Sequence, residues 1–140
     1  MDRLNHGINR AKNYIHGNTN GNAHHNKPIV IEEFGLARDG VSYDPKSPTT
    51  IKDEYFKKIF EIVYEFASQN ETMSGINYWA YGGKGRPRNS GGEYWVPGDD
   101  LIGDPPHERQ GWYTVYDKDT STKEVIKEYA DKLEALCIEG

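Results

Sequence analysis

The chain has 140 residues, 28% of them charged and 35% hydrophobic, which is typical of one globular domain. No run of about 18 apolar residues occurs, so we expect no membrane-spanning helix, and the polar residues after the first methionine predict no signal peptide in this sequence. The net charge of -5 disfavours nucleic acids and anionic membranes as partners, because both select basic faces. The single cysteine, Cys137, excludes an internal disulfide, and its apolar neighbours predict that it is buried.

The apolar spacing predicts an alternation of helices and strands. In chain order we expect a helix at 3–15, a strand at 28–34, a helix at 51–69 and a strand at 75–81. A long irregular segment at 82–110, a short extended piece at 112–116 and a closing helix at 121–136 follow. The β-branched run in the first strand is typical of a strand covered on both faces. The irregular segment is too long for an ordinary connector and predicts a functional loop.

Two helices carry the clearest apolar faces. The helix at 51–69 is expected to pack through Ile51, Tyr55, Phe56, Ile59, Ile62, Val63 and Phe66. The closing helix is expected to pack through Val125, Ile126, Tyr129, Leu133 and Leu136. Thr50 with Asp53, and Ser121 with Glu124, resemble capping boxes at their starts.

A long helix between the two main strands predicts a crossover connection and therefore parallel pairing. Two parallel strands with three amphipathic helices do not close a core, because each strand leaves an open edge. The chain therefore reads as part of a larger α/β sheet or barrel.

Two strand ends carry side chains suited to chemistry. The first strand ends in Glu32 and Glu33, at the edge where parallel sheets and barrels place their active sites. Successive strand residues point to opposite sides, so one of the two carboxylates faces that edge. Trp79 ends the neighbouring strand and would flank the same cavity, as packing or as a platform for a sugar ring.

The segments KPIVIEEFG, SGINYWAYGGKGRP and YWVPGDDLIGDPPHERQGWYTVYDKDTST, with the closing helix, resemble the C-terminal part of glycoside hydrolase family 5. They are most similar to its endo-β-1,4-mannanases, and the resemblance covers nearly all of residues 1–140. It implies a (β/α)8 barrel in which the chain supplies the sixth helix, the seventh strand and helix, and the eighth strand and helix.

The resemblance also implies roles for individual residues. Glu33 matches the nucleophile of a retaining hydrolase, and Glu32 is its outward neighbour. Trp79 matches the indole beneath the sugar at the cleavage point. The loop at 82–110 resembles the leaving-group side of the cleft, where Arg86, Trp95 and Asp100 are expected to contact sugar.

Retaining hydrolysis needs two carboxylates about 5–5.5 Å apart. The resemblance implies that this chain supplies the nucleophile but not the acid/base. The family's acid/base belongs to an Asn-Glu pair ending the fourth strand, whereas Asn70-Glu71 follows a helix and is expected at the opposite end. A complete barrel takes about 250 residues. We therefore expect an incomplete barrel, shortened by a gene-prediction error, by cloning or by genuine gene splitting, and inactive alone.

Other candidate sites are weaker. The five histidines show no ligand spacing with a partner acid, so no metal site or cofactor is expected. Asp99, Asp100 and Asp104 suit a calcium ion, although a solvated acidic loop is the simpler interpretation.

Three interpretations remain open at this stage. The chain is a fragment of a retaining mannanase, one half of a split enzyme whose partner brings the first six strands, or a non-catalytic carbohydrate-binding piece using Trp79, Trp95 and Trp112. A β-1,4-glucanase is the alternative activity. The expected partners are a mannan-type polysaccharide and either the missing barrel portion or a second copy, and the parent protein is expected to be extracellular or periplasmic.

Overall fold

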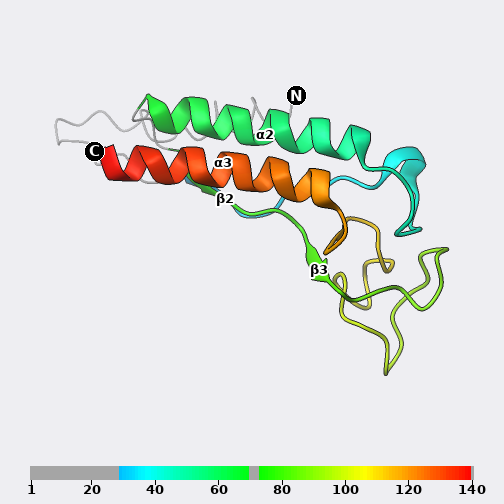
Figure 1. The fold of residues 1–140 in the computed structure, drawn as a ribbon. Helices are drawn as coiled ribbons and strands as arrows, with labels where there is room; N and C mark the ends of the chain where they lie inside the picture. Colours follow the sequence, from blue (N-terminus) through cyan, green and yellow to red (C-terminus); the bar gives the residue numbers. More distant parts are fainter. Residues whose placement is uncertain (1–28, 70–72, 140) are drawn as a thin grey trace, which may run out of the picture.

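The computed structural model describes residues 29–69 and 73–139 of the chain, which form an α/β structure (Figure 1). The predicted helix at 3–15 and the Asn70-Glu71 pair lie outside these residues. The described elements are β1 (Ile29–Ile31), the 3-10 turn η1 (Asp39–Val41), α2 (Thr50–Ser68), β2 (Met73–Ile76), β3 (Tyr81–Gly83), β4 (Val115–Tyr116) and α3 (Thr120–Glu139).

The parallel pairing predicted for the two main strands is confirmed, because β1 and β2 pair in parallel with α2 between them in the chain. The regular strands are shorter than predicted, and a register irregularity falls between Ile29 and Val30. Beyond the regular strands, the segments that follow β1 and β2 stay in contact through two backbone hydrogen bonds. Asn77 N donates to Ile31 O at 2.9 Å, and Trp79 N donates to Phe34 O at 2.7 Å. These bonds hold the segments after β1 and β2 side by side at the same end of the strand pair.

A second parallel pair, β3 with β4, brackets the long loop. The strand predicted at 75–81 would end at Tyr81, but Tyr81 begins β3, a separate strand that pairs with β4. The predicted extended piece at 112–116 is regular only over β4. The segment between β3 and β4 contains neither helix nor strand, and its two ends are held side by side by this pairing.

The two helices lie side by side and run in the same direction, with the strands along one side of the pair (Figure 1). Between helices and strands lie two apolar clusters. One is built on Phe56, Phe60, Val115 and Tyr129, with Phe34 and Tyr78 packed against it. The other is built on Val63 and Met73, with Ile29, Ile31 and Ile76. These clusters include most of the predicted face of α2 but only Val125, Ile126 and Tyr129 of the predicted face of α3.

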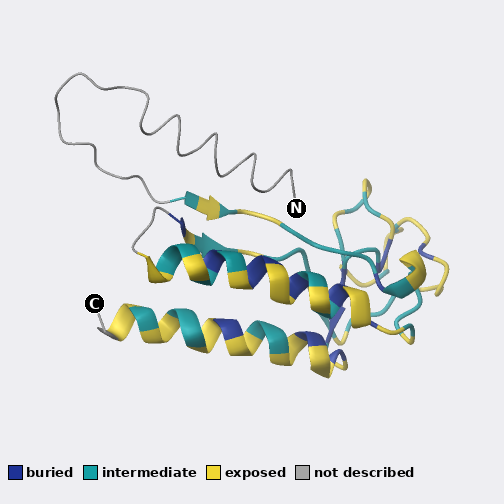
Figure 2. Cartoon of the chain, turned by 90° about the horizontal axis from the view of Figure 1, so that it is seen from above, coloured by how far each residue is buried: buried dark blue, intermediate teal, exposed yellow. Residues whose placement is uncertain are grey.

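Three burial predictions are wrong. Val30 is 48% exposed, because no described element covers the face of β1 opposite α2, and Figure 2 shows exposed and intermediate residues along this strand. Ile51 is exposed at the start of α2, where Lys52 is buried instead. Cys137 is exposed, because α3 continues to Glu139 and its last turn projects beyond the described core.

The predicted capping boxes are replaced by contacts between distant segments. The Asp39 carboxylate accepts from the backbone N–H groups of Thr50 and Ile51, at 3.1 and 2.9 Å, and so caps α2 from the preceding turn. Asp53 accepts instead from the hydroxyls of Ser121 and Thr122, which ties the starts of α2 and α3 together. Position in the fold, rather than local spacing, therefore decides which carboxylate caps α2.

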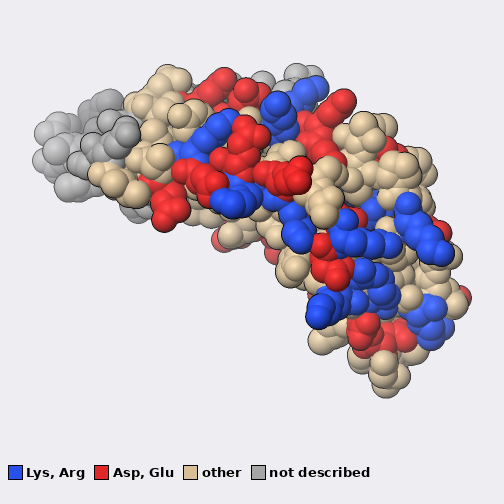
Figure 3. Space-filling view, viewed as in Figure 1, with Lys and Arg blue, Asp and Glu red and all other residues tan. Residues whose placement is uncertain are grey.

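A buried ion pair joins the segment after β1 to the start of α3. Arg38 donates to the Asp119 carboxylate, and the two side chains are 1% and 5% exposed. The surface of the helix pair mixes both charge signs (Figure 3), including the helical pairs Lys127–Asp131 and Lys132–Glu128. No helix in the described part of the chain is long and apolar enough to cross a membrane.

Candidate active site

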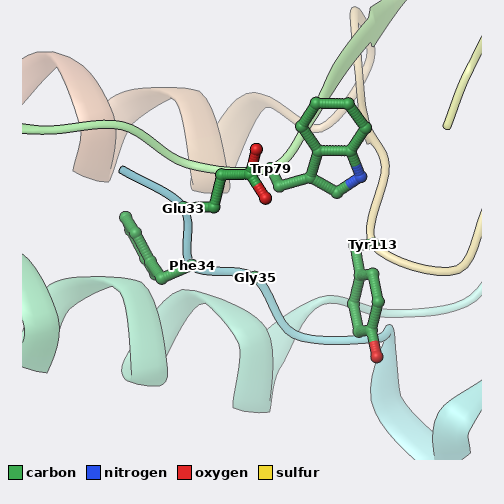
Figure 4. A pocket seen from close by; sticks show the side chains of 5 residues that line it. All are labelled: Glu33, Phe34, Gly35, Trp79 and Tyr113. Atoms are coloured by element: carbon green, nitrogen blue, oxygen red, sulfur yellow. The ribbon is translucent and has the colours of Figure 1, made fainter. Parts of the chain in front are cut away.

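Glu33 and Trp79, which follow β1 and β2, line one hollow at the ends of these strands. The hollow has a volume of about 180 Å³ and is lined by Glu33, Phe34, Gly35, Trp79 and Tyr113 (Figure 4). The bond from Trp79 N to Phe34 O fixes the two strand ends together. The peptide bond between Trp79 and Ala80 is cis.

The direction of Glu33 is set by its neighbour. Phe34 packs into the aromatic cluster on the helix side, with its ring centroid 4.8 Å from that of Phe56 and 5.3 Å from that of Phe60. Adjacent residues of an extended chain point to opposite sides, so Glu33 is turned away from the helices. Figure 4 shows its carboxylate directed toward the Trp79 ring. Glu33 is therefore the carboxylate of the pair that faces the hollow.

A second hollow, of about 310 Å³, opens from Glu33 and Trp79 toward the long loop. Its other lining residues are Asp104, His107, Glu108, Trp112 and Tyr113. Sequence reasoning did not assign Glu108 or Tyr113 to the site, although both stand in the GDPPHE and GWYTVY segments that carry the family resemblance. Neither has a distinctive local pattern: the length of the irregular segment and the family resemblance pointed to this loop, but not to either residue.

Glu108 holds the Trp79 ring. The indole Nε1–H donates to Glu108 Oε2 at 2.6 Å, and the backbone N–H of Asp104 donates to the same oxygen at 3.2 Å. The other oxygen, Oε1, is buried and has no partner in the described part of the chain. Gly103 leaves room for this carboxylate, because a Cβ there would lie 3.3 Å from Oε1.

Arg86, Trp95 and Asp100 line neither of these hollows. Arg86 donates to Asp117 at 2.5 Å and stacks over the Tyr116 ring, 4.7 Å from its centroid. Its hydrogen bond holds the pKa of Asp117 below the usual range. Contact of these three residues with sugar stays a prediction.

The other two residues also hold the loop together. The Trp95 indole N–H donates to Asp99 O at 3.0 Å, and the Asp100 carboxylate accepts from the Arg86 backbone N–H at 2.9 Å. Asp99 in turn pairs with Arg88, which lowers the pKa of Asp99. Within residues 29–69 and 73–139, no group of three or more His, Cys, Asp or Glu side chains is arranged to hold a metal ion.

Comparison with known protein families gives a match over residues 1–137 to the model described as GH family 5 beta-mannosidase-like. The chain belongs to glycoside hydrolase family 5. Two curated relatives from Arabidopsis thaliana, mannan endo-1,4-beta-mannosidases 2 and 5, are 29% and 30% identical over 55 and 53 residues. These matches cover 39% and 38% of this chain, but 12% and 11% of the relatives.

Solved structures are similar over much more of this family 5 chain. The family 5 mannosidase from Rhizomucor miehei is 44% identical, with a TM-score of 0.70, over 81% of this chain and 28% of that one. A variant of the same enzyme with one glutamate replaced by alanine, in complex with mannosyl-fructose, is 39% identical, with a TM-score of 0.70. That match covers 97% of this chain and 33% of the other. The chain thus spans about a third of the solved relatives.

Proposed function

We propose that the chain is the C-terminal portion of a (β/α)8 barrel that hydrolyses β-1,4-mannan with retention of configuration, and that Glu33 is its nucleophile. The observation that carries the proposal is the shared hollow of Glu33 and Trp79 at the ends of two parallel strands. A carboxylate beside an aromatic face is the arrangement needed to attack a sugar ring held against the indole.

In this mechanism Glu33 attacks the anomeric carbon and forms a glycosyl–enzyme ester, while a second carboxylic acid protonates the departing oxygen. Water then cleaves the ester with the same second group acting as base. Glu108 is a carboxylate in the adjoining hollow, but its Oε2 is engaged by the Trp79 indole. We therefore assign Glu108 to orientation of the indole, and the acid/base to the earlier barrel strands, as the family resemblance implies.

Mannan is the proposed substrate because the curated relatives are mannan endo-1,4-beta-mannosidases and a solved relative was crystallised with mannosyl-fructose. Arg86, Trp95 and Asp100 are proposed sugar contacts on the leaving-group side of the cleft, which longer polysaccharide substrates would reach. A β-1,4-glucanase is the competing activity. Parallel assays on mannan and on carboxymethylcellulose separate the two, since one polymer is cleaved and the other is not.

The proposed partner, besides polysaccharide, is the rest of the barrel. Val30 and Tyr81, 48% and 58% exposed, lie on strands without a described neighbour across their open faces. Barrel strands one to six would cover these faces and remove the open edges. A parent enzyme acting on mannan would work where the polymer is, outside the cell or in the periplasm.

The test joins the chain to the part of a family 5 mannosidase that runs from barrel strand one to barrel strand six, and measures reducing-sugar release from mannan. The joined protein should be active, and Glu33→Gln should lower kcat by several orders of magnitude because no ester can form. Glu32→Gln is the matched control and should keep most of the activity. Release of sugar by the 140-residue chain alone, abolished by Glu33→Gln, would contradict the proposal of an incomplete site.

A further inference from the structure

Lys52 occupies an unfavourable position for a cation. It lies in the first turn of α2 and is 0% exposed. Lysine is rarely buried without a partner, and the positive end of the helix dipole disfavours a cation in the first turn. Such a position is expected only where the side chain makes a specific contact.

That contact is with two backbone carbonyls of the pocket wall. Lys52 Nζ donates to the carbonyl oxygens of Tyr113 and Thr114, both at 2.8 Å. Among the described residues, no carboxylate forms a salt bridge with Nζ. Lys52 therefore acts as a donor to the backbone rather than as one half of an ion pair.

The held segment forms part of both hollows. Tyr113 lines each of them, and its ring stacks on that of Trp112, with centroids 5.1 Å apart and planes 9° apart. The fit to Glu33's own segment is tight, because a Cβ on Gly35 would lie 2.5 Å from Trp79 O and 3.2 Å from Tyr113 Cβ. A shift of the Tyr113 backbone would therefore change the space beside Glu33.

We propose that Lys52 is a positioning residue for this site: from α2 it fixes the Tyr113–Thr114 backbone, and through it the aromatic wall of Trp112 and Tyr113 that faces Glu33. The role of that wall in sugar binding rests on the proposed function. The anchoring of the wall by Lys52 does not.

Burial and the charged groups around Lys52 determine its pKa. Burial is the main cause that lowers its pKa to about 8, and Arg38 lowers it further. Asp119, Asp53 and Glu108 act in the opposite direction. Loss of the charge weakens both hydrogen bonds, because bonds from a charged donor are about twice as strong as neutral ones.

The test uses the 140-residue chain labelled with 15N-tryptophan, whose three indole N–H signals are assigned with Trp→Phe variants. Lys52→Met keeps an unbranched side chain but removes the donors. It should shift the Trp112 signal several times more than that of Trp95, which is held by Asp99 elsewhere in the loop. Lys58→Met, at an exposed position of the same helix, is the matched control and should move none of them. A folded Lys52→Met protein with an unchanged Trp112 signal overturns the proposal.

If Lys52→Met does not fold, the unaltered protein decides. Its Trp112 signal should titrate with a midpoint near pH 8 and should keep doing so in His107→Gln. A Trp112 signal that stays constant while Lys52 loses its proton overturns the proposal. Mannotriose added to the protein joined to barrel strands one to six tests the proposed function independently. If the indole signals respond to the Lys52 substitution but not to mannotriose there, the positioning role is retained and the proposed sugar binding is contradicted.

Discussion

The Trp79 indole N–H donates to the Glu108 carboxylate at 2.6 Å, which joins the segment just after β2 to the last part of the long loop. The two residues are 29 positions apart in the chain. Rotation of the indole is thus restricted by the loop, and the face presented to Glu33 depends on a residue outside the strands. In the proposed reaction, that restriction keeps the sugar platform oriented before substrate arrives.

Glu108→Leu should free the indole. Loss of a hydrogen bond to a charged acceptor costs roughly 1.5–3 kcal/mol, less what solvent recovers at this partly exposed site. The Trp79 indole N–H signal should move upfield and broaden, while the Trp95 signal stays in place. Glu93→Leu, which removes an exposed loop carboxylate, is the control. An unchanged Trp79 signal in Glu108→Leu would contradict the orienting role.

Trp79→Ala should act on catalysis in the completed barrel. The indole is proposed to press on the sugar where the ring flattens toward the transition state, so kcat should fall more than KM rises. Turnover and melting temperature are measured on the same preparation. Near-normal turnover with a clearly lower melting temperature would show that Trp79 only packs the strand ends.

The isolated chain should self-associate. The exposed Val30 and Tyr81 side chains and the open strand edges leave apolar surface that a second copy can cover. Light scattering of the purified chain should give a mass above the monomer's 16.0 kDa. A monodisperse monomer with one sharp melting transition would contradict both this expectation and the need for further strands.

Asp39→Ala should destabilise the chain through α2. The carboxylate accepts from two backbone N–H groups at the helix start, and removal of such a cap costs about 1 kcal/mol. Asp131→Ala, which removes an exposed pair on α3, should change the free energy of unfolding much less. Urea unfolding followed by circular dichroism compares the two, and equal losses would argue against the cap.

Stability should rise with pH above about 8 because of Lys52. Burial lowers its folded-state pKa to about 8, whereas the unfolded chain keeps the ordinary value of about 10.4. Between these values the unfolded state binds more protons, so the free energy of unfolding increases with pH, by at most about 1.4 kcal/mol per pH unit. Urea unfolding at several pH values up to about 9.5 measures this slope. Lys52→Met should lack the Lys52 contribution, and identical slopes would contradict the low pKa.

The sequence alone predicted the parts of the fold that depend on local periodicity. The apolar faces of α2 and α3 repeat at helical spacing, and the crossover between β1 and β2 requires parallel pairing. The alternation of strand residues also limited the carboxylate at the strand end to one of Glu32 and Glu33. These features follow from the local order of residues in the chain, so the sequence is sufficient to predict them.

Only the tertiary structure decided the contacts that depend on distant segments. Phe34 is drawn into the aromatic cluster of α2, and this packing turns Glu33 toward the hollow. Asp39, rather than the Thr50–Asp53 spacing, caps α2, and Lys52 is buried because the Tyr113–Thr114 carbonyls lie above it. No periodic pattern encodes such pairings, since their free energy comes from groups that approach only after the loops and helices have packed.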